Sequence, residues 1–459
     1  MFEISSISLD TVSAFGFKIF AFLVGLAVLI FVHELGHFLA ARKCGVIVEK
    51  FSIGFGKKIF GITSRGTEFI IAAIPLGGYV KMKGEELGEE TSEEGSFSAA
   101  TPQHRLLIAF AGPAFNILFA LAIYVFVYMI GVETIGPVIG TVKENSPALE
   151  AGLQTGDKII SVNNNPIRFW SQLQKKVYHS PGEKLDFQIE RLNKGIINLE
   201  IIPTTEEIKN LFGDTEQVGL IGITPLANTI TYIKKESAAE KAGLQLNDRI
   251  IAVQNINIFG WSDLRPAAVD KPGELLTFKI QRNDTEILIP LTPTPKTIKG
   301  PDGNDLKIGE IGIGMSGLMV LEQYGLIGSV SRAIKETWEM TSLIAISVQK
   351  MLFGSIPADQ IGGPILIFQI YGEQAEQGFN EFIRLTALLS INLGLINLLP
   401  IPILDGGHIL FFLIEIIKGR PVTEKNRELA QQVGFFMLIS LMVFAFYNDI
   451  ARVINYTIF

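Results

Sequence analysis

The chain has 459 residues, of which 48% are hydrophobic and 19% are charged. The hydrophobic share is high for a soluble protein, and the charged share is too high for membrane helices alone, so we expect membrane spans together with a soluble portion. A formal net charge of −7 argues against nucleic acid as the main partner, and the single cysteine, Cys44, excludes an intrachain disulfide and a cysteine-based zinc site.

The first predicted span is Phe15 to Ala40, and it contains the sequence HELGH at residues 33–37. Two histidines four positions apart lie on one face of a helix, about 6 Å apart along its axis. This spacing allows His33 and His37 to bind one zinc ion, while Glu34 between them acts as a general base toward water. Ionisable side chains inside a membrane segment are costly, which argues against a chance occurrence.

Between the first two spans, short runs of apolar and polar residues predict β-hairpins over residues 46–84. One predicted hairpin consists of residues 46–53 and 58–62. Two further short strands lie within residues 69–83 and are joined across Pro75 to Gly78.

The second predicted span is Leu106 to Ile130. An internal duplication follows it, because the sequence SPALEAGLQTGDKIISVN at Ser146 recurs as SAAEKAGLQLNDRIIAVQ at Ser237. A repeat near 90 residues indicates a duplicated domain rather than a solenoid unit. We expect each copy to contain a short helix ending at a glycine, a tight turn closed by an aspartate, and an apolar strand.

The shared pattern Ala-Gly-Leu-Gln-x-x-Asp-x-Ile resembles the PDZ domains of bacterial proteases. The resemblance implies two α+β domains, at residues 132–205 and 216–294. Such domains bind an extended peptide as an added strand.

Residues 295–374 are predicted to form a linker with an amphipathic helix from Leu326 to Phe353. Five charged residues interrupt the apolar ones, which favours a helix lying on the outer membrane surface over a fifth span. The third span is Phe382 to Leu404, with a broken C-terminal end, and the last is Val433 to Phe446, extended by its apolar flanks.

Asp405 is the best candidate for a third zinc ligand. It lies in the sequence NLLPIPILDGGH at the end of the third span, where Pro400 and Pro402 prevent a regular helix. Broken backbone at membrane depth is tolerated where it lines a cavity, and there it can present a side chain to a metal. Because three ligands already leave the open position that catalysis needs, His408 is the less favoured ligand.

The charged flanks predict the orientation of the spans. Basic residues cluster after the first span, before the second, and between the third and fourth: Arg42, Lys43, Lys50, Lys57, Lys58, Arg65, Arg105, Lys418, Arg420, Lys425 and Arg427. The positive-inside rule places these regions in the cytoplasm. Both termini and the duplicated segment are then expected outside, in the periplasm if the membrane is a bacterial inner membrane.

HELGH on one span and Asn-x-x-Pro-x-Pro-x-Leu-Asp-Gly-Gly on a later one together resemble the site-2 protease family of intramembrane zinc metalloproteases. The resemblance implies a multi-pass α-helical membrane protein with four transmembrane helices, membrane-associated β-hairpins and two α+β PDZ-like domains. It divides the membrane part into an N-terminal half, residues 1–131, and a C-terminal half, residues 375–459.

The resemblance also implies residue roles. His33, His37 and Asp405 would bind Zn²⁺, and Glu34 would be the catalytic base. The residues expected to contact substrate are Asn397, Asn392, Pro400, Pro402, Gly77 and Gly78. In this family the β-hairpins dip into the membrane near the zinc, where a sheet edge would pair with an unwound substrate; the alternative is a hairpin that only packs against the spans.

The implied reaction is hydrolysis of peptide bonds within or near the transmembrane segments of single-pass proteins. The implied substrates are a membrane-bound anti-sigma factor and remnant signal peptides, with the PDZ-like copies excluding bulky substrates, binding peptide, or both. One alternative is a non-catalytic PDZ scaffold, although structural zinc sites normally have four ligands. Another is a zinc peptidase of soluble C-terminal tails, against which the Leu-Asp-Gly-Gly motif and the PDZ-like copies argue.

Overall fold

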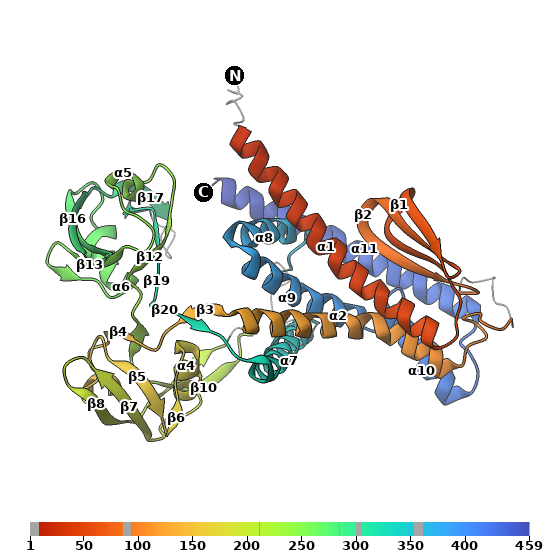
Figure 1. The fold of residues 1–459 in the computed structure, drawn as a ribbon, viewed down its shortest axis with the longest axis horizontal. Coiled ribbons are helices and arrows are strands. Elements are labelled where there is room, and N and C mark those ends of the chain that lie inside the picture. The colour runs from red at the N-terminus through yellow and green to blue at the C-terminus, as the bar shows by residue number, and fades with distance from the viewer. Residues whose placement is uncertain are drawn as a thin grey trace. The chain divides into compact units, whose positions relative to one another are not determined.

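The computed structural model describes residues 9–85, 93–210, 212–283, 285–299, 305–352 and 361–458. The chain forms two compact units, which are described separately (Figure 1). The first unit, Met1–Ile130 with Gln323–Phe459, is built mainly from helices. The second unit, Gly131–Glu322, is built mainly from strands.

The long helices of the first unit follow the apolar segments of the sequence. They are α1 (Leu9–Lys43), α2 (Pro102–Ile130), α7 (Leu326–Leu352), α8 (Pro364–Gln377), α9 (Phe379–Asn397), α10 (Asp405–Lys418) and α11 (Glu424–Ile458). Among the described residues, four stretches are long and apolar enough to cross a membrane: Phe15–Lys43, Pro102–Ile130, Phe379–Asn397 and Glu424–Ile454. The third ends at Asn397 rather than at the predicted Leu404, because the chain leaves the helix before Pro400.

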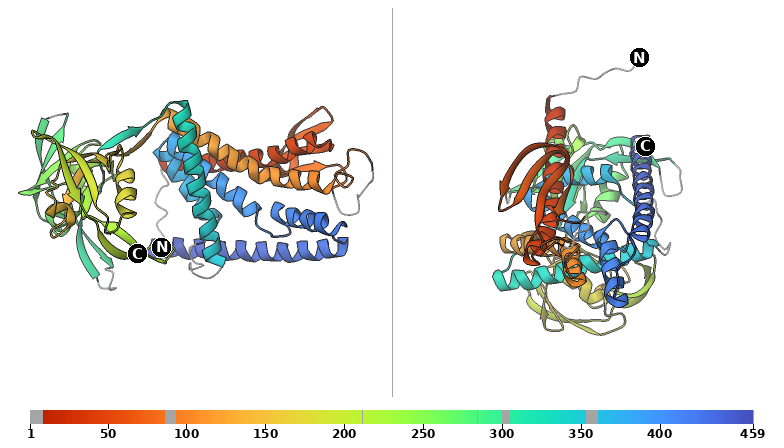
Figure 2. Two further views of the ribbon diagram at one scale, coloured as in Figure 1. Left: turned by 90° about the horizontal axis from the view of Figure 1, so that it is seen from below. Right: turned by 90° about the vertical axis from the view of Figure 1, so that its right-hand side faces the viewer.

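Helix α2 occupies the centre of this unit and contacts α1, α7, α9 and α10 (Figure 2). Glycines allow two of these contacts to be unusually close. A Cβ added at Gly36 of α1 would lie 2.4 Å from the backbone oxygen of Ala111. One added at Gly394 of α9 would lie 2.9 Å from the backbone oxygen of Pro113. Small residues at helix contacts are the usual means of close packing inside membranes.

Helix α7 runs across α2 rather than alongside it (Figures 1 and 2). Ser329 and Ala333 are fully buried on one of its faces, while Ile327 and Trp338 are exposed on another. Its described part ends at Leu352, so the predicted end at residue 353 lies outside the described residues. Its placement on a membrane surface stays a prediction.

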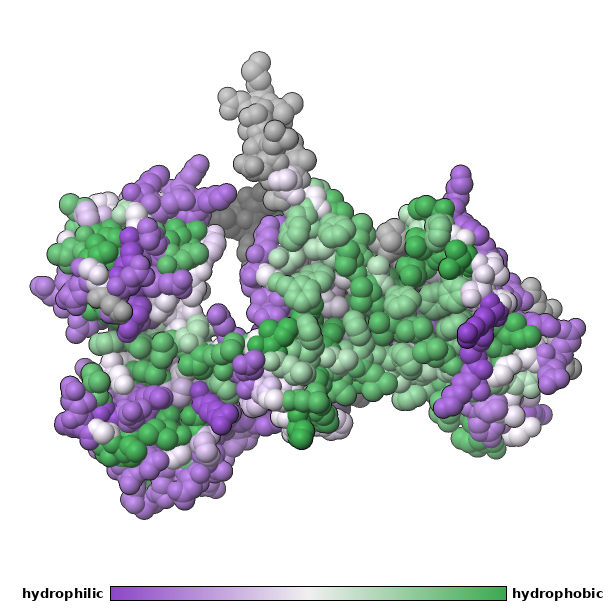
Figure 3. Space-filling view, viewed as in Figure 1, coloured by the Kyte–Doolittle hydropathy of each residue, from purple (hydrophilic) through white to green (hydrophobic). Residues whose placement is uncertain are grey.

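The segment between α1 and α2 contains β1 (Val48–Ser64) and β2 (Thr67–Met82), which pair with each other. The two separate hairpins expected from the sequence are therefore one hairpin with long strands. It folds back on itself, because residues 50–53 are paired both with residues 68–71 and with residues 78–81. Many of its apolar side chains are exposed, including Ile59, Phe60 and Ile62. Figure 3 shows apolar surface over much of this unit.

The second unit contains two copies of one arrangement. The first consists of β4 (Ile139–Val142), α3 (Pro147–Glu150), β5 (Lys158–Val162), β6 (Asn165–Pro166), α4 (Trp170–Tyr178), β7 (Leu185–Arg191), β8 (Gly195–Ile201), β9 (Thr204–Lys209), β10 (Thr215–Leu220) and β11 (Ile223–Pro225). The second repeats it as β12 (Thr229–Ile233), α5 (Ala238–Ala242), β13 (Arg249–Val253), β14 (Ile256–Asn257), α6 (Trp261–Leu264) with the π-helix η1 (Arg265–Val269), β15 (Leu276–Arg282), β16 (Thr285–Leu291), β17 (Thr294–Lys299), β18 (Asp305–Glu310) and β19 (Ile313–Ser316). Each copy has its own apolar core. Strands β3 (Val132–Ile135) and β20 (Met319–Glu322) pair and bring the two ends of the unit together.

The domain boundaries expected at residues 205, 216 and 294 all fall inside the copies. In the first copy β11 returns to pair with β4, and in the second β19 returns to pair with β12. The repeated helix and turn signal ends before these closing strands. The segments that lead into them are nevertheless alike, since residues 219–223 read GLIGI and residues 309–313 read GEIGI. Residues 295–316 are therefore part of the second copy rather than a linker.

The repeated aspartate closes the same clasp in both copies. Asp157 accepts two hydrogen bonds from Arg191, at 2.8 and 2.7 Å, and Asp248 accepts two from Arg282, both at 2.7 Å. The two carboxylates are nearly fully buried. These bonds raise the pKa of each arginine above its usual range, so both stay charged. The turn predicted from the aspartate is thus fastened to β7 or β15.

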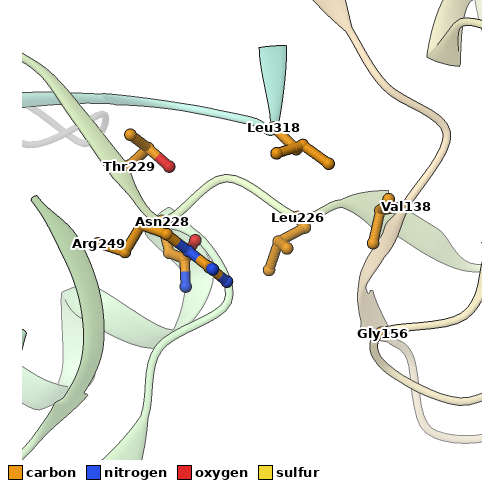
Figure 4. Close-up of a pocket in the computed structure, with 7 residues that line it drawn as sticks. All are labelled: Val138, Gly156, Leu226, Asn228, Thr229, Arg249 and Leu318. Atoms are coloured by element: carbon orange, nitrogen blue, oxygen red, sulfur yellow. The ribbon is translucent and has the colours of Figure 1, made fainter. Parts of the chain in front are cut away.

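A cavity of about 280 Å³ lies within this unit where the first copy meets the second (Figure 4). Its lining residues are Val138, Gly156, Leu226, Asn228, Thr229, Arg249 and Leu318. The amide nitrogen of Asn228 already has two hydrogen-bond partners, because it donates to the backbone oxygens of Ile250 and Ile258. The cavity is therefore part of the junction between copies.

Candidate metal centre

The two histidines of HELGH lie on the face of α1 that contacts α2. His33 and His37 are 8% and 9% exposed, and their Nε2 atoms lie 3.2 Å apart. The i, i+4 spacing predicted this common face. Gly112 of α2 makes room for both rings, because a Cβ there would lie 2.3 Å from His37 Nε2 and 2.9 Å from His33 Cε1.

Asp405 is the first residue of α10 and faces the same two nitrogens. Its Oδ2 lies 3.1 Å from His33 Nε2, and its Oδ1 lies 3.5 Å from His37 Nε2. The two following glycines allow the tight turn that places it there. A Cβ at Gly406 would lie 2.2 Å from the backbone oxygen of Leu399, and one at Gly407 would lie 2.4 Å from that of Ile401.

These three side chains fit a zinc ion. Tetrahedral zinc with bonds of about 2.0–2.1 Å places its ligand atoms about 3.3 Å apart, which matches the observed 3.1 to 3.5 Å. Asp405 Oδ2 is buried, and apart from its 3.1 Å contact with His33 Nε2 it has no hydrogen-bond partner within the described part of the chain, as expected of a metal ligand. Among the described residues, this is the one group of three or more His, Cys, Asp or Glu side chains suited to a metal, and His408 is outside it.

Glu34 lies between this group and the β-hairpin. Its carboxylate is within hydrogen-bonding reach of the backbone N–H of Val80 on β2. A Cβ at Gly78 would lie 3.1 Å from Glu34 Cγ and 2.7 Å from Ile30 Cγ2, so the strand approaches α1 closely at this point. A Cβ at Gly77 would instead meet the ring of Phe55, 2.0 Å away.

The remaining predicted residues lie along the segment that leads to Asp405. The Asn397 amide nitrogen lies 3.5 Å from His33 Nε2. Asn392 is half-buried on α9, more than one turn before Asn397, and Pro400 is exposed. Pro402 packs against α11, where a Cβ at Gly434 would lie 3.3 Å from its Cδ. Of this set, Asn397 and Gly78 are the two that the structure brings next to the HELGH residues.

Sequence reasoning missed the contribution of α2. His37 Nδ1 donates to the backbone oxygen of Ile108 at 2.8 Å, and Asn116 Nδ2 donates to His33 Nδ1 at 3.2 Å. The available signal was an asparagine in the middle of an apolar span, since polar residues inside membranes are costly and generally functional.

A second missed contact holds α10 against α2. Arg105 donates to Glu415 at 2.8 Å, and both side chains are 12% exposed. The Arg105 guanidinium also lies over the ring of Phe412, 5.1 Å from its centre. Because α10 carries Asp405 at its start, this contact helps to fix the third candidate ligand.

Comparisons with known proteins agree with this geometry. The family model of peptidase family M50 matches residues 21–441. Protease RseP of Yersinia pestis is 36% identical over 448 residues, which cover 94% of this chain and 98% of that protein. Regulator of sigma-E protease RseP of Escherichia coli (strain K12) is 35% identical over 454 residues, covering 94% and 98%. A protein of Vibrio cholerae named putative zinc metalloprotease is 35% identical over 451 residues, also covering 94% and 98%.

The family match includes both HELGH and the Asp405 motif, and the relatives match over nearly their whole length. The chain therefore belongs to peptidase family M50, the site-2 protease family, and is a zinc metalloprotease.

Proposed function

We propose that His33, His37 and Asp405 hold the zinc of an intramembrane peptidase, and that this enzyme hydrolyses peptide bonds within or near transmembrane segments. The observation that carries the proposal is the convergence of three ligand atoms, all within 4.8 Å of one another, from a helix able to span a membrane and from a broken segment after another such helix. Glu34 follows the first of these ligands in the chain and faces the β-hairpin beside them.

Each residue has a definite task in this proposal. When bound, zinc supplies a Lewis acid that polarises the scissile carbonyl and makes a nearby water more acidic. Glu34 removes the proton of that water and later delivers it to the leaving amine. The Asn397 amide, 3.5 Å from His33 Nε2, is placed to donate a hydrogen bond to the oxygen on which negative charge develops.

The hairpin supplies a means of holding the substrate extended. A transmembrane helix hides its peptide bonds in its own hydrogen bonds, so it must unwind before attack. Residues 78–82 pair with β1 on one side and lie against α1 near Glu34. An unwound substrate added along this strand by β-augmentation would lie beside the candidate catalytic base.

The duplicated copies would act as PDZ-like domains that select substrates. The curated relatives named regulators of sigma-E protease suggest a membrane-bound anti-sigma factor as substrate, and remnant signal peptides are a second class. Strand β19 pairs with β12 alone among the described strands, which leaves one edge for a peptide. Size exclusion by the two copies is the complementary role.

The proposed orientation has the copies in the periplasm of a bacterial inner membrane and the candidate centre toward the cytoplasm, and the basic flanks support it. Because Cys44 is the only cysteine, Cys44→Ser chains carrying Leu192→Cys or Arg65→Cys permit a direct test. A membrane-impermeant maleimide should label Cys introduced at 192 in intact spheroplasts, and at 65 only after lysis. The reverse pattern would refute this orientation.

The function is tested with the purified chain and a single-span substrate in liposomes. Cleavage should map by mass spectrometry to the apolar segment, stop after zinc is removed with a chelator, and return when Zn²⁺ is restored. A structural zinc, as in a PDZ scaffold, predicts zinc in the chain without cleavage. Cleavage confined to soluble tails would favour the other peptidase class.

A further inference from the structure

Asn116 is fully buried on α2 beside the candidate zinc ligands, and the proposed chemistry gives it no role. Its Nδ2 donates to His33 Nδ1 at 3.2 Å. Its Oδ1 is buried and has no hydrogen-bond partner within the described residues. An unsatisfied buried amide oxygen is destabilising, so a partner in another state of the site would explain its presence there.

The two histidines differ in the hydrogen bond made by Nδ1. His37 Nδ1 donates to the Ile108 carbonyl, which can only accept, so the neutral ring keeps its lone pair on Nε2, facing Asp405. His33 Nδ1 accepts from Asn116, so the neutral ring carries its proton on Nε2, 3.1 Å from Asp405 Oδ2. This second arrangement suits a site without metal.

Metal binding through His33 Nε2 requires the other tautomer, with the proton on Nδ1. We propose that Asn116 is a positioning residue that serves His33 in both states. Rotation of its amide by about 180° exchanges nitrogen and oxygen in nearly the same space. Oδ1 then accepts the proton of His33 Nδ1, and this bond fixes the tautomer and the ring orientation that a metal needs.

The surroundings of Asn116 support this role. Ser390 of α9 donates to the backbone oxygen of Asn116 at 2.8 Å. A Cβ at Gly394 would lie 3.4 Å from Asn116 Cβ, so α9 packs closely against this turn of α2. The backbone is thereby fixed, while an amide is the uncharged side chain that can donate or accept at one position.

The test measures zinc affinity by competition with a chelator, and the inference rests on the proposed zinc centre. Asn116→Leu and the smaller Asn116→Ala should each weaken zinc binding by about 10- to 100-fold. Asn116→Asp keeps an acceptor for His33 Nδ1 and should bind zinc about as tightly as the wild type. Ser390→Ala is the matched control, because it loosens the same helix contact without touching His33, and its zinc affinity should be unchanged.

Several outcomes would overturn the inference. Wild-type affinity in both Asn116→Leu and Asn116→Ala would show that His33 needs no partner. An equal loss in Asn116→Asp, which keeps the size of the side chain and an acceptor, would show that accepting from His33 Nδ1 is not what zinc binding needs. An equal loss in Ser390→Ala would show that packing of α9 against α2 is responsible. The His33→Ala chain separates the two proposals. If His33→Ala binds zinc as tightly as the wild type, the proposed zinc centre itself is wrong. If His33→Ala loses zinc affinity while the Asn116 variants keep wild-type affinity, only the positioning role is refuted.

Discussion

At the scale of single residues, the candidate centre depends on glycines of α1 and α2 as well as on the candidate ligands. Gly112 leaves the space in which both imidazoles meet, and Gly36 allows the backbones of α1 and α2 to touch. Backbone and ring atoms are displaced only at a greater cost than the end of a flexible side chain. The positions of His33 and His37 are therefore set by a glycine on another helix.

Gly112→Ala tests this dependence. The added Cβ would lie 2.3 Å from His37 Nε2, so the ring must shift and zinc affinity and cleavage should fall by about 10-fold or more. Gly16→Ala is the control, since nothing lies within 4 Å of a Cβ there and alanine favours a helix by about 1 kcal/mol. Equal zinc affinity in both variants would contradict the proposed packing.

Sequence reasoning found the three candidate ligands because their chemistry is local. Helical periodicity alone places both histidines of HELGH on one face, and the prolines that break the end of a span mark Asp405 as a candidate. The position of Asn116 in an apolar span signalled a role, but neither its partner nor that of Gly112 could be predicted, because both contact a helix some 80 positions earlier in the chain. A single glycine or asparagine in an apolar segment does not indicate which residue it contacts in the fold.

At the scale of elements, the duplicated copies show which structural features can be predicted from the sequence. The helix, the turn and the following strand were predicted, because glycine and aspartate have local conformational roles. The closing strands β11 and β19 were missed, since their pairing is set by long-range register. Nor did the pattern show that Arg191 and Arg282, 34 positions after their aspartates, complete the turn.

Arg282→Leu tests the clasp in the second copy. Removing the guanidinium leaves the Asp248 carboxylate buried without its ion pair, which should destabilise that copy by about 3–5 kcal/mol. Lys279→Ala on the same strand loses only an exposed pair with Glu286 and should cost about 0–1 kcal/mol. Limited proteolysis of the full chain during heating measures both, and equal melting of residues 227–316 in the two variants would contradict the account.

At the scale of the whole molecule, the candidate centre joins the two ends of the sequence. His33 and Asp405 are 372 positions apart, and the Gly131–Glu322 unit lies between them in the chain. Helix α2 brings the halves together, because it contacts both α1 and α10. The copies are thus inserted into the peptidase sequence rather than appended to it.

The central claim is that Glu34 is the base of a zinc peptidase centre. Glu34→Gln leaves the three candidate ligands intact and keeps the size of the side chain, but it removes the proton acceptor. We expect unchanged zinc content and a loss of cleavage of a single-span substrate in liposomes by at least about 100-fold. Cleavage by Glu34→Gln at the wild-type rate, with zinc bound, would contradict it.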